Sequence, residues 1–92
     1  MRVIHKFGPF NIRELNILEN VHRIVHFAQG SEGLYVWCEK DKDKLRSRNI
    51  EILIVGTGWD YESSWEHQGT VIDKAGYVWH LLESKEFLGA PV

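Results

Sequence analysis

The sequence is short of cysteine and of net charge, and each shortage excludes a class of protein. Cys38 is the only cysteine among the 92 residues, so the chain can form no internal disulfide and offers no cysteine-rich zinc site. The formal net charge of −2 creates no long-range positive field, which argues against binding of long nucleic acid or of an anionic membrane. A small anionic ligand held by a local pocket is still compatible with this charge.

Long apolar runs are also missing. No segment approaches the length of a membrane-spanning helix, and residues 1–11 lack the apolar stretch of a signal peptide. A lone cysteine suits a reducing compartment. We therefore expect a single soluble, intracellular domain over residues 1–92, without a linker, a repeat or a low-complexity segment.

What the chain does have is strand-like runs of aliphatic and aromatic side chains. Residues 50–55, IEILIV, form the clearest expected strand, and its apolar side chains fall on both faces. One face carries Ile50, Ile52 and Ile54, and the other carries Leu53 and Val55. A strand with one wet face would alternate apolar and polar residues, so both faces of this strand must be covered.

Residues 34–38 and 77–82 repeat this two-faced pattern. Three strands that need cover on both sides are hard to satisfy with one sheet from a chain of 92 residues. A compact sandwich of two sheets would supply the cover, and so would a second copy of the protein. Of the two, we favour a homo-oligomer.

Turn residues divide the chain into strands and hairpins. Gly8-Pro9 is expected to end a first strand over Val3–Phe7. The turns at residues 30–33 and 73–76 are each expected to join two strands, Val21–Gln29 with Leu34–Glu39 and Thr70–Ile72 with Tyr77–Leu82. Residues 40–44 form a mixed-charge run typical of a solvated loop, and residues 58–67 form a long loop that carries three aromatic side chains.

Residues 11–29 fit two structures. Asn11 and Glu14 make a capping box, and an apolar stripe follows at helical period, which predicts a short helix ended by Gly30: Ile17, Leu18, Val21, Ile24, Val25 and Ala28. Against a helix, residues 21–29 are rich in β-branched side chains and run into the next strand after only a tight turn. Periodicity alone favours the helix.

Three segments carry a resemblance to known proteins. They are RIVHF and LYVW at residues 23–27 and 34–37, ILIVGTG at residues 52–58, and GTVI and GYVWHLLE at residues 69–72 and 76–83. In order and approximate spacing they are similar to a family of small, largely uncharacterised proteins of tailed bacteriophages and prophages. The resemblance implies an all-β fold, either a small twisted antiparallel sheet or a sandwich, and hence a strand over residues 21–29.

The turn that follows residues 50–55 is the candidate binding site. Successive N–H groups at Gly56, Thr57 and Gly58 can form an anion-binding nest, to which the threonine hydroxyl adds a donor. Trp59 and Tyr61 offer stacking surfaces directly after it. Arg46 and Arg48 can donate to a phosphate in bidentate fashion, although they precede the strand and could reach the turn only from a neighbouring strand or subunit. A glycine turn that merely ends a strand is the alternative interpretation.

No catalytic or metal-binding pattern is stronger than its structural alternative. His22 and His26 would form a metal pair only on a helix, and Cys38, in an apolar strand, fits a buried thiol better than a nucleophile. Ser63 and Ser64 lack the strand–turn–helix setting of a nucleophile elbow. We therefore expect a binding protein with no catalytic residues, no metal and no cofactor.

Together these features lead to one main functional hypothesis. The protein would be a phage accessory factor in the host cytoplasm that sequesters a small nucleotide signal of antiviral defence, such as a cyclic dinucleotide, in a pocket between subunits. Such a ligand needs donors for its phosphates and flat surfaces for its bases. The alternatives are an inhibitor that binds a host protein directly and a structural or assembly component of the virion.

Overall fold

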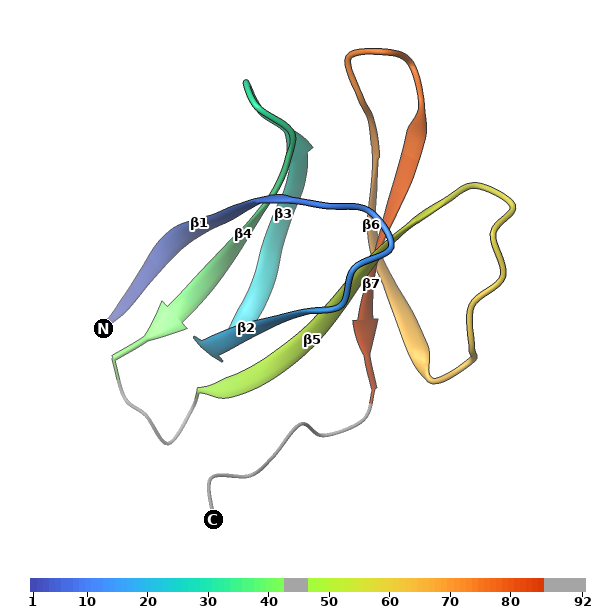
Figure 1. Ribbon diagram of the computed structural model, residues 1–92. Coiled ribbons are helices and arrows are strands. Elements are labelled where there is room, and N and C mark those ends of the chain that lie inside the picture. The colour runs from blue at the N-terminus through green and yellow to red at the C-terminus, as the bar shows by residue number, and fades with distance from the viewer. Residues whose placement is uncertain (43–46, 86–92) are drawn as a thin grey trace.

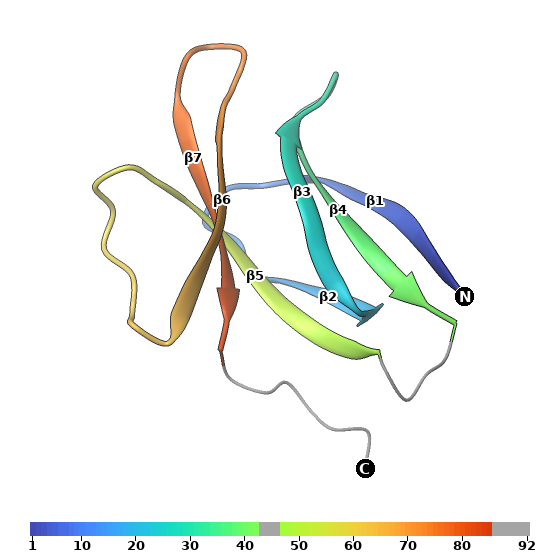
Figure 2. The same cartoon turned by 180° about the vertical axis from the view of Figure 1, so that it is seen from behind.

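The computed structural model describes residues 1–42 and 47–85, which form two antiparallel β-sheets packed against each other (Figures 1 and 2). The first sheet has the strand order β1-β4-β3 and the second has the order β2-β5-β7-β6. The strands are β1 (Arg2–Phe10), β2 (Asn16–Val21), β3 (Arg23–Gln29), β4 (Leu34–Asp41), β5 (Arg48–Gly56), β6 (Trp65–Ile72) and β7 (Val78–Ser84). The expected all-β sandwich is confirmed. The described residues contain no helix, and so none that could cross a membrane.

The core lies between the two sheets and is built from alternate residues of their strands. Sheet β1-β4-β3 contributes the inward side chains of β4, and sheet β2-β5-β7-β6 contributes those of β5 and β7. The most deeply buried of these are Val36, Cys38, Ile52, Ile54 and Leu81. Each buried aliphatic side chain contributes on the order of 1.5–3 kcal/mol relative to exposure, so this layer supplies most of the hydrophobic stabilisation.

The sandwich also explains the two-faced strands. Ile50, Ile52 and Ile54 of β5 face the core, while Val55, on the outer face, is buried beside the loop that carries Trp59. In β7, Leu81 faces inward and Leu82 outward, and both are fully buried. The two sheets of one chain therefore bury much of the apolar surface that the sequence predicted to need cover.

The helix considered for residues 11–29 does not form. Residues 16–21 belong to one sheet and residues 23–29 to the other, and the chain crosses between the sheets at His22. The strand expected over Val21–Gln29 is therefore wrong at its start. Two irregularities in register, between Leu18 and Val21 and between Ile24 and His26, explain the helical period. An extra residue in a strand lets side chains three apart face the same way, as they do on a helix.

Four other boundaries differ from expectation. Strand β1 continues through Gly8-Pro9 to Phe10 with a register shift, instead of ending at Phe7. Trp65 and the two residues after it begin β6, where a loop was expected. Tyr77 lies in the β6–β7 connection and is 65% exposed, so the turn is one residue longer than residues 73–76. Lys40 and Asp41, expected in a loop, end β4, and residues 43 and 44 lie outside the described part of the chain.

Candidate functional site

The Gly-Thr-Gly segment forms a tight turn at the end of β5. The N–H of Trp59 donates to the carbonyl oxygen of Gly56 at 3.2 Å, and Gly58 has a φ of +86°, a conformation that favours glycine. A Cβ at Gly56 would lie 2.8 Å from Cε2 of Trp59, so the indole packs directly on the glycine backbone. The turn thus folds Trp59 back over the end of β5. Because the backbone N–H of Trp59 is hydrogen-bonded within the turn, the predicted anion nest depends on the N–H groups of Thr57 and Gly58.

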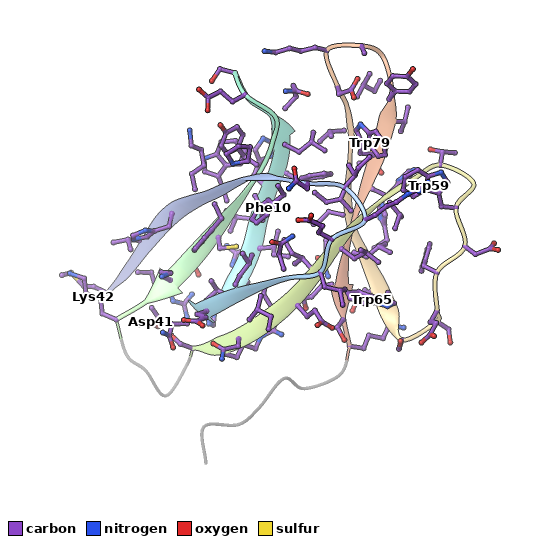
Figure 3. The ribbon with its side chains drawn as sticks, in the orientation of Figure 1. Phe10, Asp41, Lys42, Trp59, Trp65 and Trp79 are labelled. Carbon is purple, nitrogen blue, oxygen red and sulfur yellow. The ribbon has the colours of Figure 1, made fainter. Side chains whose placement is uncertain are left out.

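Trp59 is held between an arginine and a second tryptophan. The guanidinium carbon of Arg13 lies 4.0 Å from the ring centroid of Trp59, and the ring of Trp79 meets the Trp59 ring edge-on, with 5.6 Å between centroids. Figure 3 labels the two tryptophans. The indole N–H of Trp79 donates to Asp73 Oδ2 at 2.8 Å. This hydrogen bond, followed by backbone N–H donors of the turn, lowers the pKa of Asp73. The β6–β7 turn therefore fixes Trp79, and Trp79 supports Trp59.

Arg13 has no carboxylate partner within residues 1–42 and 47–85, which distinguishes it from the other arginines there. Among the described arginines, Arg2 and Arg23 pair with Glu39, and Arg48 pairs with Glu83. Arg13 instead stacks on Trp59, and its backbone N–H donates to the Ile54 carbonyl at 3.0 Å. Its φ of 66° lies in the left-handed region, which non-glycine residues rarely occupy. A stacked, uncompensated guanidinium beside a cavity is well placed to meet an anion.

A hydrogen-bonded chain of polar side chains crosses the outer face of sheet β2-β5-β7-β6. The hydroxyl of Thr57 lies 2.7 Å from Nε2 of His80, and Nδ1 of His80 lies 2.9 Å from the hydroxyl of Thr70. That hydroxyl lies 2.8 Å from Nε2 of His67. The strand register causes this arrangement, because Thr70 pairs with His80 between β6 and β7, and His80 pairs with Val55 between β7 and β5.

These side chains line a cavity of about 380 Å³, within the usual range for small-molecule sites. We call it the His80 pocket and define it by six side chains: Thr57, Trp59, Tyr61, His67, Thr70 and His80. Tyr61 is 49% exposed and offers an accessible ring, whereas Trp59 forms a half-buried wall. Two cavities adjoin it at Trp59, one lined by Arg13 and Asp60 and the other by Tyr77 and Trp79.

The structure brings together five of the seven residues proposed from the sequence. Gly56, Thr57, Gly58, Trp59 and Tyr61 all line the His80 pocket. Arg48 does not, because it lies at the other end of β5, where its Nη2 is 3.2 Å from Glu83 Oε2. Arg46 lies outside the described residues.

Four residues of this region were missed by the sequence reading, namely Arg13, His67, Thr70 and His80. The last three meet only through strand pairing, which a local motif does not reveal.

Cys38 is a buried thiol, as expected. Its burial, with a smaller contribution from the charge of Glu83, raises its pKa to about 12, so the thiolate required of a nucleophile is strongly disfavoured. The His22 and His26 rings have different neighbours, because Nε2 of His22 lies 4.0 Å from Glu39 Oε1 and the ring of His26 lies against Trp37. In residues 1–42 and 47–85, no three His, Cys, Asp or Glu side chains gather as they would around a metal ion.

Comparison with known proteins gives one match. No curated protein and no solved structure matches the chain. A family model described as a domain of unknown function, DUF7352, matches residues 1–89. The match covers nearly all of the sequence, including both sheets and the His80 pocket. The chain therefore belongs to the DUF7352 family.

Proposed function

We propose that this protein binds a small nucleotide in the His80 pocket and sequesters it without chemical change. The ligand class is an anionic nucleotide with exposed phosphates, such as a cyclic dinucleotide. The setting would be the cytoplasm of an infected bacterium, where a phage accessory protein would remove a signal of antiviral defence. This setting rests on the resemblance of residues 23–37, 52–58 and 69–83 to proteins of tailed phages.

One observation carries the ligand class: the pocket combines hydrogen-bonding side chains with aromatic rings and has no acidic lining residue in the described part of the chain. Threonine hydroxyls and imidazoles can donate to phosphate oxygens, and Tyr61 can stack on a base. Arg13, in place of the expected Arg46 and Arg48, supplies the nearby guanidinium. A base stacked on an aromatic ring is worth about 1–3 kcal/mol.

Sequestration differs from catalysis in what it requires. A protein that removes a signal by stoichiometric binding needs tight affinity, with a dissociation constant in the nanomolar range, or about −12 kcal/mol. It needs no nucleophile, and the one cysteine is buried in the core. We also propose a homo-oligomer, in which a second copy would cover the open side of the pocket and provide a surface for the second base.

Calorimetry against cyclic di-AMP, cyclic di-GMP and cyclic AMP tests the proposal. We expect nanomolar binding of at least one of them, and we expect Tyr61→Ala to weaken it by about tenfold or more through lost stacking. Tyr77→Ala is the matched control, since Tyr77 is a similarly exposed tyrosine outside the His80 pocket. Absence of heat with all three nucleotides would discard the proposal. Light scattering of the same sample tests the oligomer.

Exposed apolar side chains favour a second candidate, direct binding to a host protein or to a virion component. Ile4 and Ile17 lie on the edge strands β1 and β2, and Ile72 lies on the edge strand β6; they are 62%, 56% and 66% exposed. Edge strands with exposed apolar side chains can pair with a strand of another protein. Capture of one defined host protein by the purified chain, combined with no nucleotide binding, would favour this candidate over sequestration.

A further inference from the structure

The hydrogen-bonded chain in the His80 pocket has two ends. Its three contacts run from Thr57 through His80 and Thr70 to His67, over 2.7, 2.9 and 2.8 Å. Each hydroxyl carries one proton, and each neutral imidazole carries one proton on one of its two nitrogens. The directions of the two bonds to His80 therefore depend on which ring nitrogen carries its proton.

With a neutral His80, the two tautomers of its ring give opposite directions for the contact with Thr57. In the first, Thr57 donates to Nε2 of His80 and Nδ1 donates to Thr70, whose contact with His67 can then run either way. Thr57 then presents only lone pairs to the cavity, which repel an anion. In the second, His67 donates to Thr70, Thr70 donates to Nδ1 of His80, and Nε2 donates to Thr57, whose own proton is left to point into the cavity.

With a protonated His80, only one direction remains for each of its two contacts. Both ring nitrogens donate, Nε2 to Thr57 and Nδ1 to Thr70, whatever the direction of the contact between Thr70 and His67. The Thr57 hydroxyl then accepts from His80, and its own proton is available to a ligand in the cavity. Protonation thus adds a positive charge beside the pocket and turns Thr57 into a donor, and both changes favour an anionic oxygen.

We propose that the His80 pocket takes up one proton from solvent when it binds a phosphodiester anion, with His80 as the proton acceptor and Thr57 as the donor to the ligand. This inference rests on the proposed function and specifies how its site recognises charge. The proton adds to a ring nitrogen lone pair of His80, and no bond of the ligand breaks. Binding and protonation favour each other, because each stabilises the same hydrogen-bond direction.

The groups around His80 do not balance the positive charge of its protonated ring, so that the ligand can do so. Facing His80 are Thr57 from the turn after β5, His67 and Thr70 from β6, and Trp59 and Tyr61 from the connecting loop. None of these is a carboxylate. Asp60, an acidic residue of the loop, lines the adjoining cavity together with Arg13. An imidazolium here has no carboxylate in the pocket lining to neutralise it, so a bound phosphodiester would serve as its counter-ion.

Calorimetry of the whole protein with cyclic di-AMP, cyclic di-GMP and cyclic AMP, from about pH 5 to pH 8, tests this inference. Phosphodiesters do not titrate in this range, so any proton taken up binds to the protein. We expect affinity to fall by up to about tenfold per pH unit on the alkaline side. We also expect binding heats that change with the ionisation enthalpy of the buffer, in proportion to one proton.

Two variants assign the proton. His80→Gln should bind more weakly, with an affinity independent of pH and a heat independent of buffer, and Thr57→Val should lose affinity most at low pH. His26→Gln, on the other sheet, is the matched control and should keep the wild-type profile. Tight binding that does not vary with pH or buffer overturns the inference and leaves the proposed function standing. No binding at any pH overturns both, and proton uptake that survives in His80→Gln overturns the assignment to His80.

Discussion

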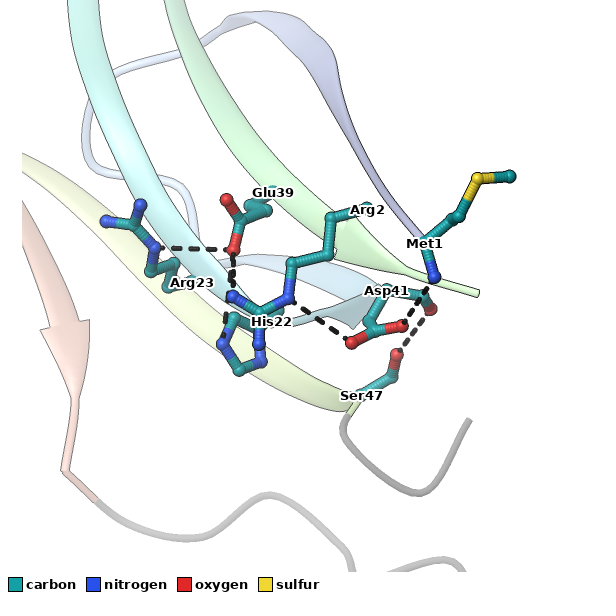
Figure 4. Close-up of polar contacts among 7 residues, drawn as sticks. All are labelled: Met1, Arg2, His22, Arg23, Glu39, Asp41 and Ser47. Carbon is teal, nitrogen blue, oxygen red and sulfur yellow. Dashed lines mark hydrogen bonds and ion pairs between the residues drawn. The ribbon is translucent and has the colours of Figure 1, made fainter. Parts of the chain in front are cut away.

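Polar groups gather on the outer faces of both sheets, but they are arranged in opposite ways. On sheet β1-β4-β3, Glu39 contacts Arg2 at 3.1 Å and Arg23 at 3.4 Å, and Asp41 contacts Arg2 at 3.3 Å (Figure 4). His22 lies 4.0 Å from the same Glu39 oxygen. We call these five residues the Glu39 cluster. At the end of β5, by contrast, Arg13 has no carboxylate partner in the part of the chain that the structure describes, and the row of hydrogen-bonded polar side chains opens into a cavity.

The contrast separates groups that stabilise the fold from groups that can receive a ligand. In the Glu39 cluster each arginine is matched by an acid, so a ligand would have to displace an existing partner. Ion pairs of this kind contribute little to stability, typically below about 1 kcal/mol each. In the His80 pocket the donors and rings face open volume, and that combination is typical of binding sites. Changes in the two regions should therefore have different consequences.

The largest effect should come from Gly56→Ala. The new Cβ would lie 2.8 Å from Trp59, so the indole must move, and overpacking of this kind costs about 1–3 kcal/mol of stability. Because Trp59 walls the His80 pocket, nucleotide affinity should fall as well. Gly69→Ala is the control, since a Cβ there would make only an ordinary contact, 3.5 Å from Phe27. Urea unfolding and calorimetry give both quantities. Wild-type affinity in a folded Gly56→Ala would contradict the role of Trp59.

Replacement of an arginine tests the comparison directly. Arg13→Met should lower nucleotide affinity by about tenfold, or about 1.4 kcal/mol, and should reduce stability by only about 0.5–1 kcal/mol, the value of an exposed cation–π contact. Arg23→Met, in the Glu39 cluster, should leave affinity unchanged. If the two variants bind nucleotide equally well in calorimetry, Arg13 has no part in the site.

Glu39→Gln should have a smaller effect, confined to stability. The substitution keeps the size of the side chain and removes the charge that Arg2 and Arg23 share. We expect a loss of about 0.5–1 kcal/mol in urea unfolding and no change in nucleotide affinity. A drop in affinity would show that the Glu39 cluster and the His80 pocket are coupled, which would contradict the distinct roles of the two regions.

The smallest effect should be a local acid transition at Asp73. Its pKa is lowered in the folded protein, first by the Trp79 indole N–H and then by backbone donors, so its stabilising effect is present above the ordinary value of 3.8. That effect should disappear as the pH falls through the lowered pKa. The Trp79 indole proton signal, followed by NMR, should shift in this range, and in Asp73→Asn it should not. A signal unchanged down to the acid unfolding of the whole chain would contradict this role.

Much of the fold was predictable because its strands and turns have local signals. The two hairpins, the buried strand after Arg48 and the apolar side chains on both faces of residues 34–38 all follow from the sequence. The division of residues 16–29 between two sheets did not, because bulges gave those strands a helical period. A bulge depends on pairing with a partner strand, which the local sequence does not specify.

The site was predictable only where it is continuous in the chain. Residues 56–59 and Tyr61 follow one another, so a sequence reading finds them. The Thr70–His80 contact depends on register, and a four-residue turn at 73–76 would pair Thr70 with Trp79 instead. The extra turn residue, Tyr77, moves His80 opposite Thr70 and onto the outer face. One residue in a turn thus decides whether His80 lines the pocket beside Thr70.

The most direct test of nucleotide binding in the His80 pocket is an amide NMR titration of the intact protein with cyclic di-AMP, cyclic di-GMP and cyclic AMP. We expect at least one nucleotide to shift the signals of residues 56–61 together with Thr70 and His80, while those of Arg2, Arg23 and Glu39 stay in place. Shifts centred on Glu39, or spectra unchanged by all three nucleotides, would contradict it.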